Sequence, residues 1–501
     1  MTDPRTPVVV GVGQVEQRVA PADAREPIAL FADAVRAAAD DSGQGGSVLA
    51  RVDTVAAVQI VSWPYADPGA RVAAELGIEP RRAVVSTVGG NSPQLLVNEM
   101  AAEIAAGSCD VVVIGGAESM HARWGARREP RVHLDWAVDE GTPYARVIGD
   151  PRAGTNEIEQ AHFAVAPTHI YPLFETALRA AADRTIAEHQ QATGELWSQF
   201  AAVAASNPHA WSRVAYTAEA IVTPTAENRM VVFPYTKRMC ANIDVDQGAA
   251  VILCSYEAAR SMGIAEDRMV FLHAGADAHD HWFVTERAAL AEAPAIGITV
   301  RAALDAAGLG VDDVARFDLY SCFPSAVQMA MHAIGLRGRA GGDDRPLTVT
   351  GGLGFAGGPV NNYPTHGIAA MVDALRADPG SVGLTTALGW YATKHSAGVW
   401  STSPPARFAR VDPARTQAEA DALPRREPAG LVEGDMTIEA TSVVMERDGT
   451  PAVAIVAGLL PDSRRALANS RDPDLMLELT RTGWEGRTVR VVNDGTANTL
   501  A

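Results

Sequence analysis

Apolar and polar positions follow two patterns in the first 120 residues. Short apolar runs without alternation, typical of strands buried on both faces, lie at Val8–Val12, Val55–Ile60, Ala83–Val88 and Val111–Ile114. Between them apolar residues recur at helical spacing, in Pro27–Asp40, Ala70–Leu76 and Pro93–Ala106. Strands that alternate with helices in this way predict a mostly parallel sheet covered by helices on both faces.

The same order returns in the second half of the chain. Strands are predicted at Arg268–His273, Phe317–Tyr320, Leu347–Thr350 and Val382–Thr386. Helices are predicted between them, at Ile298–Ala307, Ala326–Ile334 and His366–Arg376. In both halves the third strand runs through a glycine turn and a helix into a fourth strand. We interpret the chain as a duplication, with two βαβαβαβ halves packed around two adjacent central helices.

Further segments separate and extend the halves. The insertion at 120–230 is partly helical (Leu173–Gln190 and Glu195–Asn207), and insertions of this size often cap a site. A core strand at Ala249–Cys254 then returns to the first half. Thr402–Gly430 is rich in Pro, Arg and Ala and is interpreted as an ordered linker.

From Leu431 onward the pattern becomes β-rich. Met436–Glu446 and Pro451–Leu460 flank an Asp-Gly pair that favours a hairpin turn, and the last strand is predicted at Thr488–Val492. A small OB-like β-barrel is expected. Its few basic and aromatic residues favour a structural or interaction role over nucleic-acid binding. The predicted divisions are 1–119, 120–230, 231–265, 266–403, 404–430 and 431–501.

Composition narrows the class of protein. The 501 residues carry a net charge of −18 and no Lys/Arg-rich run, which disfavours nucleic acid and anionic membranes as partners. No stretch approaches the ~20 apolar residues of a transmembrane helix, and the N-terminus does not resemble a signal peptide. Four scattered cysteines suggest neither a disulfide framework nor a metal site. A cytoplasmic protein is expected.

The turn at 87–93 is a candidate for chemistry. Ser92 is placed to be the N-cap of the following helix, and Pro93 suits its first position. Unpaired N–H groups at a helix start can stabilise an oxyanion. The ordinary alternative is a tight turn that only packs.

The segment from Ala83 to Met120 resembles the thiolase segment that carries the nucleophilic cysteine before a buried helix. Counting back from Gly115-Gly116 places Gly90 at the position of that cysteine. The loop at Met239-Cys240-Ala241 and the strand that begins at Asp246 also resemble thiolase segments. Because Gly90 has no side chain, no acyl-cysteine can form there.

Three more segments continue the resemblance. Tyr320-Ser321-Cys322-Phe323 lies where thiolases have NEAF or HDCF, which puts Tyr320 at the water-holding position. Thr350–Pro359 is similar to the GG…GHP motif, with Gly358 in place of the catalytic histidine. The last catalytic loop falls within Ala387–Gly398, which contains no cysteine. With its extra C-terminal domain, the chain resembles thiolase-like proteins type 1, often called acetyl-CoA acetyltransferases.

This resemblance implies a five-layered α-β-α-β-α thiolase fold with a duplicated βαβαβαββ unit, a cap and the barrel. Thiolases usually pair through the edge strand that corresponds here to Ala83–Val88, so the chain is expected to be a monomer or a homodimer. A CoA thioester of lipid metabolism is the implied ligand, with no other cofactor and no metal. A protein partner at the C-terminal domain is a further expectation.

The missing residues exclude ordinary thiolysis and Claisen condensation, which need a nucleophile and a base. One hypothesis is an acyltransferase of altered mechanism, with Tyr320, His366 or His395 moving the proton. The other is a non-catalytic acyl-CoA binder or a partner subunit of another enzyme. The expected substrate-binding residues are Gly90, Asn91, Ser92, Cys322, Phe323, Gly357, Gly358, Pro359 and Gly389.

Several of these residues have ordinary alternative interpretations. His366 could be a helix-cap or packing residue, and Cys322 a small buried apolar one. Lys394 and His395 would then form a solvated turn.

Overall fold

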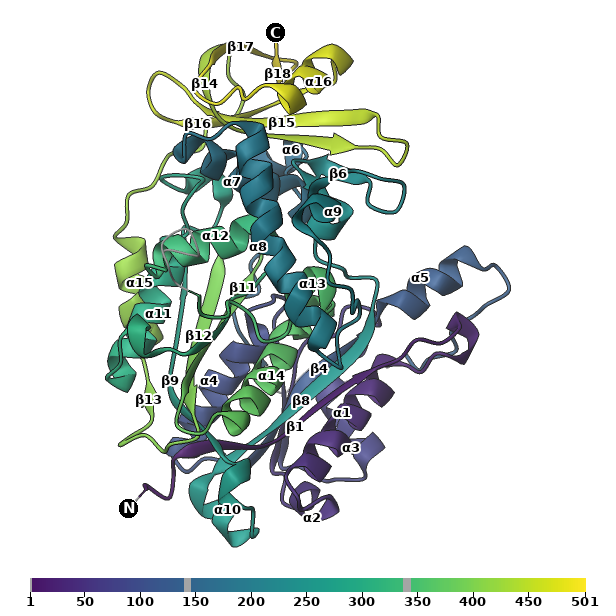
Figure 1. Ribbon diagram of the computed structural model, residues 1–501, viewed down its shortest axis with the longest axis vertical. Coiled ribbons are helices and arrows are strands. Elements are labelled where there is room, and N and C mark those ends of the chain that lie inside the picture. The colour runs from purple at the N-terminus through teal and green to yellow at the C-terminus, as the bar shows by residue number, and fades with distance from the viewer. Residues whose placement is uncertain (1, 139–145, 337–343) are drawn as a thin grey trace.

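The computed structural model describes residues 2–138, 146–336 and 344–501. Within them, the larger sheet has eleven strands, and each half of the duplication contributes a set to it (Figure 1). The first set runs in the order β1-β8-β4-β2-β3, and its strands are β1 (Pro7–Glu16), β2 (Thr54–Ala57), β3 (Arg82–Ser86), β4 (Val111–Ser119) and β8 (Asp246–Ser255). The second runs β9-β12-β11-β10, with β9 (Val270–His279), β10 (Arg316–Asp318), β11 (Val382–Gly389) and β12 (Lys394–Ser401).

Two helices lie between these sets of strands, and others cover their outer faces. The central pair is α4 (Ser92–Ala105) and α14 (Tyr363–Ala377), whose apolar residues share one buried cluster with β1, β8 and β9. Outside lie α1 (Pro27–Asp41), α2 (Gly46–Leu49), α3 (Pro68–Leu76) and α10 (Tyr256–Ser261) on one half, and α11 (Pro294–Ala307) and α12 (Pro324–Ala333) on the other. The sets join where Val8 and Val9 of β1 pair with β9. This arrangement confirms the five-layered, duplicated fold.

The prediction of a mostly parallel sheet was wrong. β8 runs antiparallel to β1 and β4, and β12 runs antiparallel to β9 and β11. Parallel pairs occur between β2 and its neighbours β3 and β4, between β3 and β5 (Val147–Ile148), and between β10 and β11. The short loop from β11 to β12 can join only antiparallel neighbours. The sequence pattern predicted β8 as a core strand without its direction, and it did not predict β12.

The strand predicted at Leu347–Thr350 was also wrong. The segment does run beside β10, where Leu319 N–H donates to Leu347 O at 3.0 Å. However, Thr348 Oγ1 accepts hydrogen bonds from the N–H groups of Thr350 (3.2 Å) and Gly351 (2.9 Å). A side chain that binds nearby N–H groups competes with a regular strand.

Most helices of the insertion lie between the two sheets, whereas α5 projects to the side (Figure 1). Its helices are α5 (Met120–Arg128), α6 (Glu157–Ala161), α7 (Pro167–Ala181), α8 (Ile186–Ser206) and α9 (Ala218–Val222). The sequence predicted two helices here, separated near residues 191–194. In the structure the separation between α7 and α8 lies at 182–185. Thr185 and Glu188 form a capping box there, with Glu188 N–H donating to Thr185 Oγ1 at 3.2 Å.

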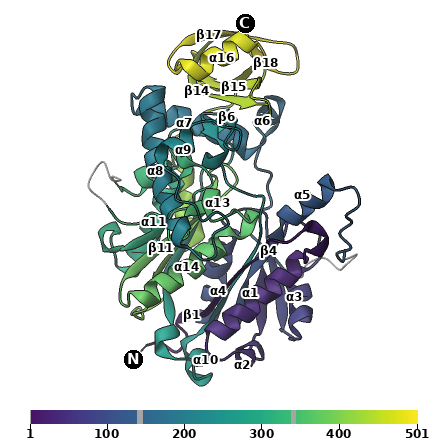
Figure 2. The ribbon, with the colours of Figure 1, turned by 45° about the vertical axis from the view of Figure 1, so that its right-hand side comes forward.

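The C-terminal residues form a closed five-stranded barrel at one end of the molecule (Figure 2). Its strands are β14 (Gly434–Met445), β15 (Pro451–Leu459), β16 (Arg465–Ser470), β17 (Thr488–Asn493) and β18 (Asn498–Leu500), with helix α16 (Pro473–Arg481). β14 pairs with both β15 and β17, which closes the barrel. Two strands at and just beyond the end of the insertion, β6 (Met230–Phe233) and β7 (Tyr235–Thr236), extend this sheet.

The predicted linker contains regular structure. It holds β13 (Ala409–Arg410), which pairs with β9, and α15 (Pro413–Asp421). Asp412 caps this helix by accepting the Ala414 N–H at 2.9 Å, and Pro413 occupies a first-turn position. α15 packs on β9 and α11. This part of the predicted linker is therefore ordered and packs against the second half of the chain.

One buried arginine fixes the barrel to the rest of the chain. Arg465 of β16 is fully buried, and it pairs with Glu439 of β14 through Nε (2.7 Å) and Nη2 (3.0 Å). Its Nη1 donates to Arg287 O at 2.5 Å and to Val284 O at 3.3 Å, in and beside the short helix η4 (Val284–Glu286). None of the helices in the described ranges is both long and apolar enough to cross a membrane.

Candidate functional site

Three loops meet at the N-terminus of the central helix α4. The first is the 87–92 turn, and the second, 357–362, precedes α14. The third, 389–394, joins β11 to β12. Gly89 N–H donates to Asn361 Oδ1 at 2.9 Å, which links the first loop to the second. Lys394 Nζ donates to Val88 O at 2.6 Å, which links the first loop to the third.

Tyr320 fills the place where a side chain on Gly90 would lie. A Cβ atom on Gly90 would be 2.2 Å from Tyr320 Oη and 2.5 Å from Leu388 O. Both distances are far below a normal van der Waals contact. The helix start therefore packs directly against the end of β11 and the tyrosine ring, and a cysteine at position 90 has no room.

The 357–362 loop is shaped by glycine at one position and strained at another. A Cβ on Gly357 (φ +110°) would lie 2.1 Å from Gln247 Oε1. Gly358 has space instead, since its Cβ would lie 3.4 Å from the nearest atoms. Val360 has φ +44°, which is costly for a β-branched residue. Trp390 and Ala392 of the third loop also have positive φ, at 57° and 52°.

The meeting point of these loops contains buried polar groups without partners. Asn91 Oδ1 and Trp390 Nε1 are both buried and make no hydrogen bond to any described residue. Asn91 Oδ1 is wedged between the glycines of two loops, 2.6 Å from a Cβ on Gly89 and 2.4 Å from one on Gly389. Native proteins rarely leave buried polar atoms unpaired, so this cluster is a candidate for a ligand site, although other buried atoms of the described chain, such as Asn469 Oδ1, are unpaired as well.

One prediction at this turn was wrong, and one alternative considered for the third loop does not hold. Asn91, not Ser92, is the N-cap residue, and no side chain caps the helix. Ser92 is the first helical residue, and its Oγ donates to Thr87 O at 2.7 Å, which closes the turn. The solvated turn considered for Lys394 and His395 is absent as well: both lie in β12 and are only 5% and 4% exposed.

Lys394 is the titratable residue of the site that sequence reasoning did not select. Burial lowers the pKa of its amine to about 8. Asp150 acts in the opposite direction, while Arg152 lowers the pKa further. A lysine in the loop of a missing catalytic cysteine was the only signal in the sequence.

The two histidines selected from the sequence contact other parts of the molecule. His395 Nε2 lies 3.3 Å from Asp280 Oδ2 and 3.1 Å from Ala392 O, and its side chain lines a small cavity against α11 and α12. His366 Nδ1 lies 2.9 Å from Gln14 Oε1 of β1. Burial lowers the pKa of His366 to about 3, so its ring is neutral at physiological pH.

Tyr320, Cys322 and Phe323 are all buried at the end of β10. Burial raises the pKa of Tyr320 well above its usual value, and that of Cys322 to about 12. Neither is therefore ionised at neutral pH, so neither is an activated nucleophile or base. Phe323 stacks between Tyr171 and Tyr235, with ring centroids 4.6 and 5.4 Å away, as a core residue would.

The remaining selected residues lie in the second loop. Gly358 N–H donates to Asn242 O at 2.9 Å, in the segment that follows Met239-Cys240-Ala241. Pro359 then leads into the short helix η7 (Val360–Asn362). Asn362, its last residue, donates to Gly116 O at 2.6 Å. The second loop is thereby fixed to β4 as well as to the first loop.

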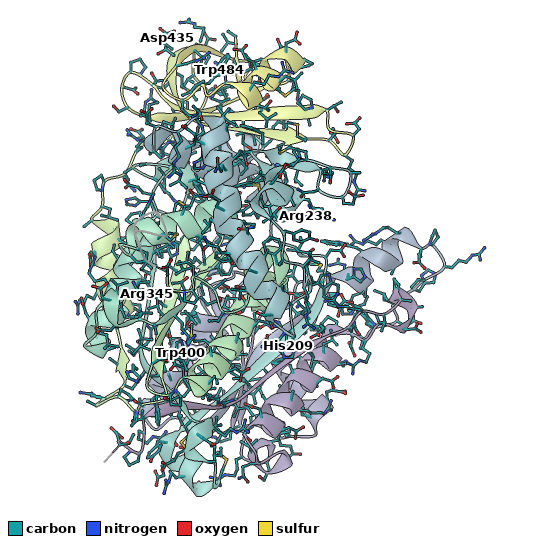
Figure 3. The ribbon with its side chains drawn as sticks, in the orientation of Figure 1. His209, Arg238, Arg345, Trp400, Asp435 and Trp484 are labelled. Atoms are coloured by element: carbon teal, nitrogen blue, oxygen red, sulfur yellow. The ribbon has the colours of Figure 1, made fainter. Side chains whose placement is uncertain are left out.

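Buried polar contacts hold α4 in register with the strands behind the site. Trp400, inside the lower part of the molecule (Figure 3), donates from Nε1 to Thr385 Oγ1 at 2.8 Å. Thr385 Oγ1 donates in turn to Gln94 Oε1 of α4 at 2.8 Å. The position of the helix N-terminus is therefore set by β11 and β12.

A second chain of contacts connects the third loop to the barrel. Arg287 is buried, and its Nη2 donates to Thr393 Oγ1 at 2.9 Å. The backbone carbonyl of Arg287 accepts a hydrogen bond from Arg465. The barrel thus supports the segment that fixes Thr393, next to Lys394.

Fold and site together define a protein of the thiolase superfamily. A solved structure of a monomeric SCP2-thiolase-like protein type 1 from Mycobacterium smegmatis is 36% identical, with both chains covered completely and a TM-score of 0.85. The chain belongs to the SCP2-thiolase-like protein type 1 family. Residues 416–496 match the family model described as the thiolase-like protein type 1 additional C-terminal domain.

More distant structures share the fold alone. An Ltp2-ChsH2(DUF35) aldolase is 21% identical over 79% of this chain and 98% of the other, with a TM-score of 0.59. An acetyl-CoA acetyltransferase from Syntrophomonas wolfei is 16% identical over 80% and 100%, with a TM-score of 0.56. Among curated proteins, none matches the chain.

Proposed function

We propose that this protein binds a CoA thioester where the three loops meet, and that it catalyses neither ordinary thiolysis nor Claisen condensation. The observation that carries the proposal is the unpartnered polar cluster at the start of α4, in a place closed to a cysteine side chain. The family to which the chain belongs is named after thiolases, whose ligands are CoA thioesters.

The polar groups of the cluster suit such a ligand. In the described chain, the N–H of Gly90 makes no hydrogen bond, and it lies at the positive end of the α4 dipole. It can donate to a thioester carbonyl oxygen. The pantetheine arm of CoA contains two amides, which offer a donor for Asn91 Oδ1 and an acceptor for Trp390 Nε1. These pairings would satisfy the orphaned groups.

The absence of thiolase chemistry follows from the same geometry. Gly90 and Gly358 stand where the resemblance places the catalytic cysteine and histidine of thiolases. Glycine supplies neither a nucleophile nor a base. Tyr320 is neutral, and His366 and His395 are engaged by Gln14 and Asp280. Of the titratable groups considered, Lys394 alone faces the Gly89 turn with a pKa near the working range.

Calorimetric titration with CoA, acetyl-CoA and a longer acyl-CoA tests the proposal. Gly358→Leu places a side chain at the second loop, where a first carbon fits. Gly430→Leu is the matched control, because a Cβ there meets nothing within 4 Å. We expect submillimolar binding that Gly358→Leu abolishes and Gly430→Leu retains. The absence of heat with all three ligands, or robust thiolysis of acetoacetyl-CoA, would contradict the proposal.

A partner subunit of another enzyme is the alternative function. The Ltp2-ChsH2(DUF35) aldolase contains a chain of similar fold, and its name includes a DUF35 component. Co-sedimentation with a DUF35-domain protein from the same cell tests this alternative. A stable complex without CoA binding by the chain alone would favour it over the proposal above.

We also infer that the protein is a monomer. The strand β5 of the insertion pairs with β3, with Val85 N–H donating to Arg146 O (3.1 Å) and Thr87 N–H to Ile148 O (2.8 Å). The edge through which thiolases pair is therefore covered by the chain itself. The barrel lies at the other end of the molecule and is not needed to cover it (Figure 2).

A further inference from the structure

Lysine is rare in this chain, and one lysine lies at the candidate site. It occurs only at positions 237 and 394, whereas the other 40 basic residues are arginine. Lys237 is exposed and Lys394 is buried. Arginine stays protonated at physiological pH, but a buried lysine can lose its proton. Lys394 is thus the one buried side-chain amine of the chain.

Neutral groups hold the Lys394 amine. Nζ donates to the carbonyl of Val88 and lies 5.6 Å from the centroid of the Trp390 ring. Nowhere in the described ranges does a carboxylate form an ion pair with it, and the charges of Asp150 and Arg152 act on it in opposite directions. With a pKa of about 8, roughly a quarter of the amines are neutral at pH 7.5.

The amine faces the turn where a thioester carbonyl would be polarised. A Cβ on Gly89 would lie 2.8 Å from Lys394 Nζ and 2.6 Å from the unpartnered Asn91 Oδ1. The next residue, Gly90, has a free N–H at the N-terminus of α4, a helix of 14 residues. A nucleophilic amine from β12 therefore faces the turn that carries a donor for an oxyanion.

We infer that Lys394 accepts an acyl group from a thioester bound at this site. This inference rests on the proposed CoA-thioester binding. The lone pair of the neutral Nζ attacks the carbonyl carbon, and the Gly90 N–H stabilises the oxyanion. The C–S bond then breaks, and the CoA thiolate leaves with its electron pair. The proton lost from Nζ passes to the thiolate, so the products are an Nε-acyl-lysine and free CoA.

The modification is stoichiometric, because an amide is much less reactive than a thioester. Acylation removes the charge of Lys394 and places an acyl chain beside Gly89 and Trp390. We therefore expect the acylated protein to bind further acyl-CoA more weakly than the unmodified protein does.

The test incubates the full-length folded protein with acetyl-CoA at pH 7 and at pH 9, followed by intact mass measurement and peptide mapping. The exposed Lys237 serves as an internal control in the same molecule. We expect one acetyl group on Lys394, added at least tenfold faster than on Lys237. Its rate should rise about tenfold between the two pH values, following the neutral amine. Lys394→Arg should abolish this addition, whereas Lys237→Arg should leave it unchanged.

Calorimetry with unacylated CoA separates failure of this inference from failure of the proposed function. CoA binding without faster acylation of Lys394 than of Lys237 would overturn the inference and leave the proposed function intact. Neither binding nor acylation would overturn both. If Lys394→Arg fails to fold, the comparison of the two lysines in the unmodified protein still decides the question.

Discussion

Replacement of Gly90 by cysteine introduces the residue type that thiolases use as their nucleophile, and we expect it to damage the fold without producing thiolase activity. The new Cβ would lie 2.2 Å from Tyr320 Oη and 2.5 Å from Leu388 O. Relief of these contacts needs movements of roughly 1 Å, and one of the groups is backbone. Overpacking of a well-packed interior costs about 1–3 kcal/mol, so we expect a loss near the upper end, about 3 kcal/mol.

Urea unfolding followed by tryptophan fluorescence measures this loss. Gly358→Cys is the matched control, because its Cβ would meet only ordinary contacts at 3.4 Å. We expect that variant to lose less than about 1 kcal/mol. Thiolysis of acetoacetyl-CoA should stay at background in both variants, since neither provides a nucleophile together with a histidine.

A double variant identifies the cause of the damage. Tyr320→Ala in the Gly90→Cys background removes the closest contact but leaves Leu388 O in place. The two substitutions should therefore couple favourably, by about 0.5–3 kcal/mol. A Gly90→Cys protein as stable as the parent, or one with clear thiolysis, would refute our account of this turn.

Three further predictions concern the barrel, the buried amine and the sheet edge. Arg465→Ala should destabilise the protein by about 3–5 kcal/mol in urea unfolding, because it leaves buried acceptors unpaired. Arg464→Ala, at a side chain that is 41% exposed, should change the stability by less than about 0.5 kcal/mol, and equal effects would contradict the role of Arg465. Lys394 has a lower pKa in the folded chain (about 8) than in the unfolded chain (about 10.4). Between about pH 8 and pH 10.4 the unfolded chain therefore binds more protons than the folded chain does. Stability relative to Lys394→Met should thus rise by about 3 kcal/mol from pH 7 to above pH 10, and a flat difference in urea unfolding would contradict the burial of the amine. Sedimentation should show that the unmodified chain is a monomer. Ile148→Pro, which disrupts β5, should increase self-association. A stable homodimer of the unmodified chain would show that the β3 edge is open.

The sequence was sufficient for most of the element order but not for strand direction. Apolar runs and helical spacing located both halves and their central helices, because these segments are buried and strongly patterned. The returning strands β8 and β12 have the same apolar character as parallel ones, so composition did not reveal their direction. Thr348 shows a second limit, since its side chain takes the N–H groups that a strand would use.

The segments of the candidate site could be predicted from the sequence, but the place of Lys394 among them could not. The positions of Gly90 and Gly358 follow from ordered motifs along the chain, whereas the last loop could be placed only within Ala387–Gly398. Lys394 and His395 are consecutive, and consecutive residues of a strand face opposite sides of a sheet. Only the register of β12 shows that Lys394 faces the Gly89 turn while His395 faces α11. No pattern in the sequence determines that register.

The buried Arg465 also sets an order of events during synthesis. Arg287, which holds Thr393 of the third loop, lies in a segment whose carbonyls bind an arginine that is translated nearly 180 residues later. Chains fold largely in the order in which they emerge from the ribosome. The carbonyls of the 284–288 segment therefore lack their Arg465 partner until the barrel has been synthesised. We expect a ribosome-bound chain that stops before residue 465 to have its core helices in place but its third loop unfixed.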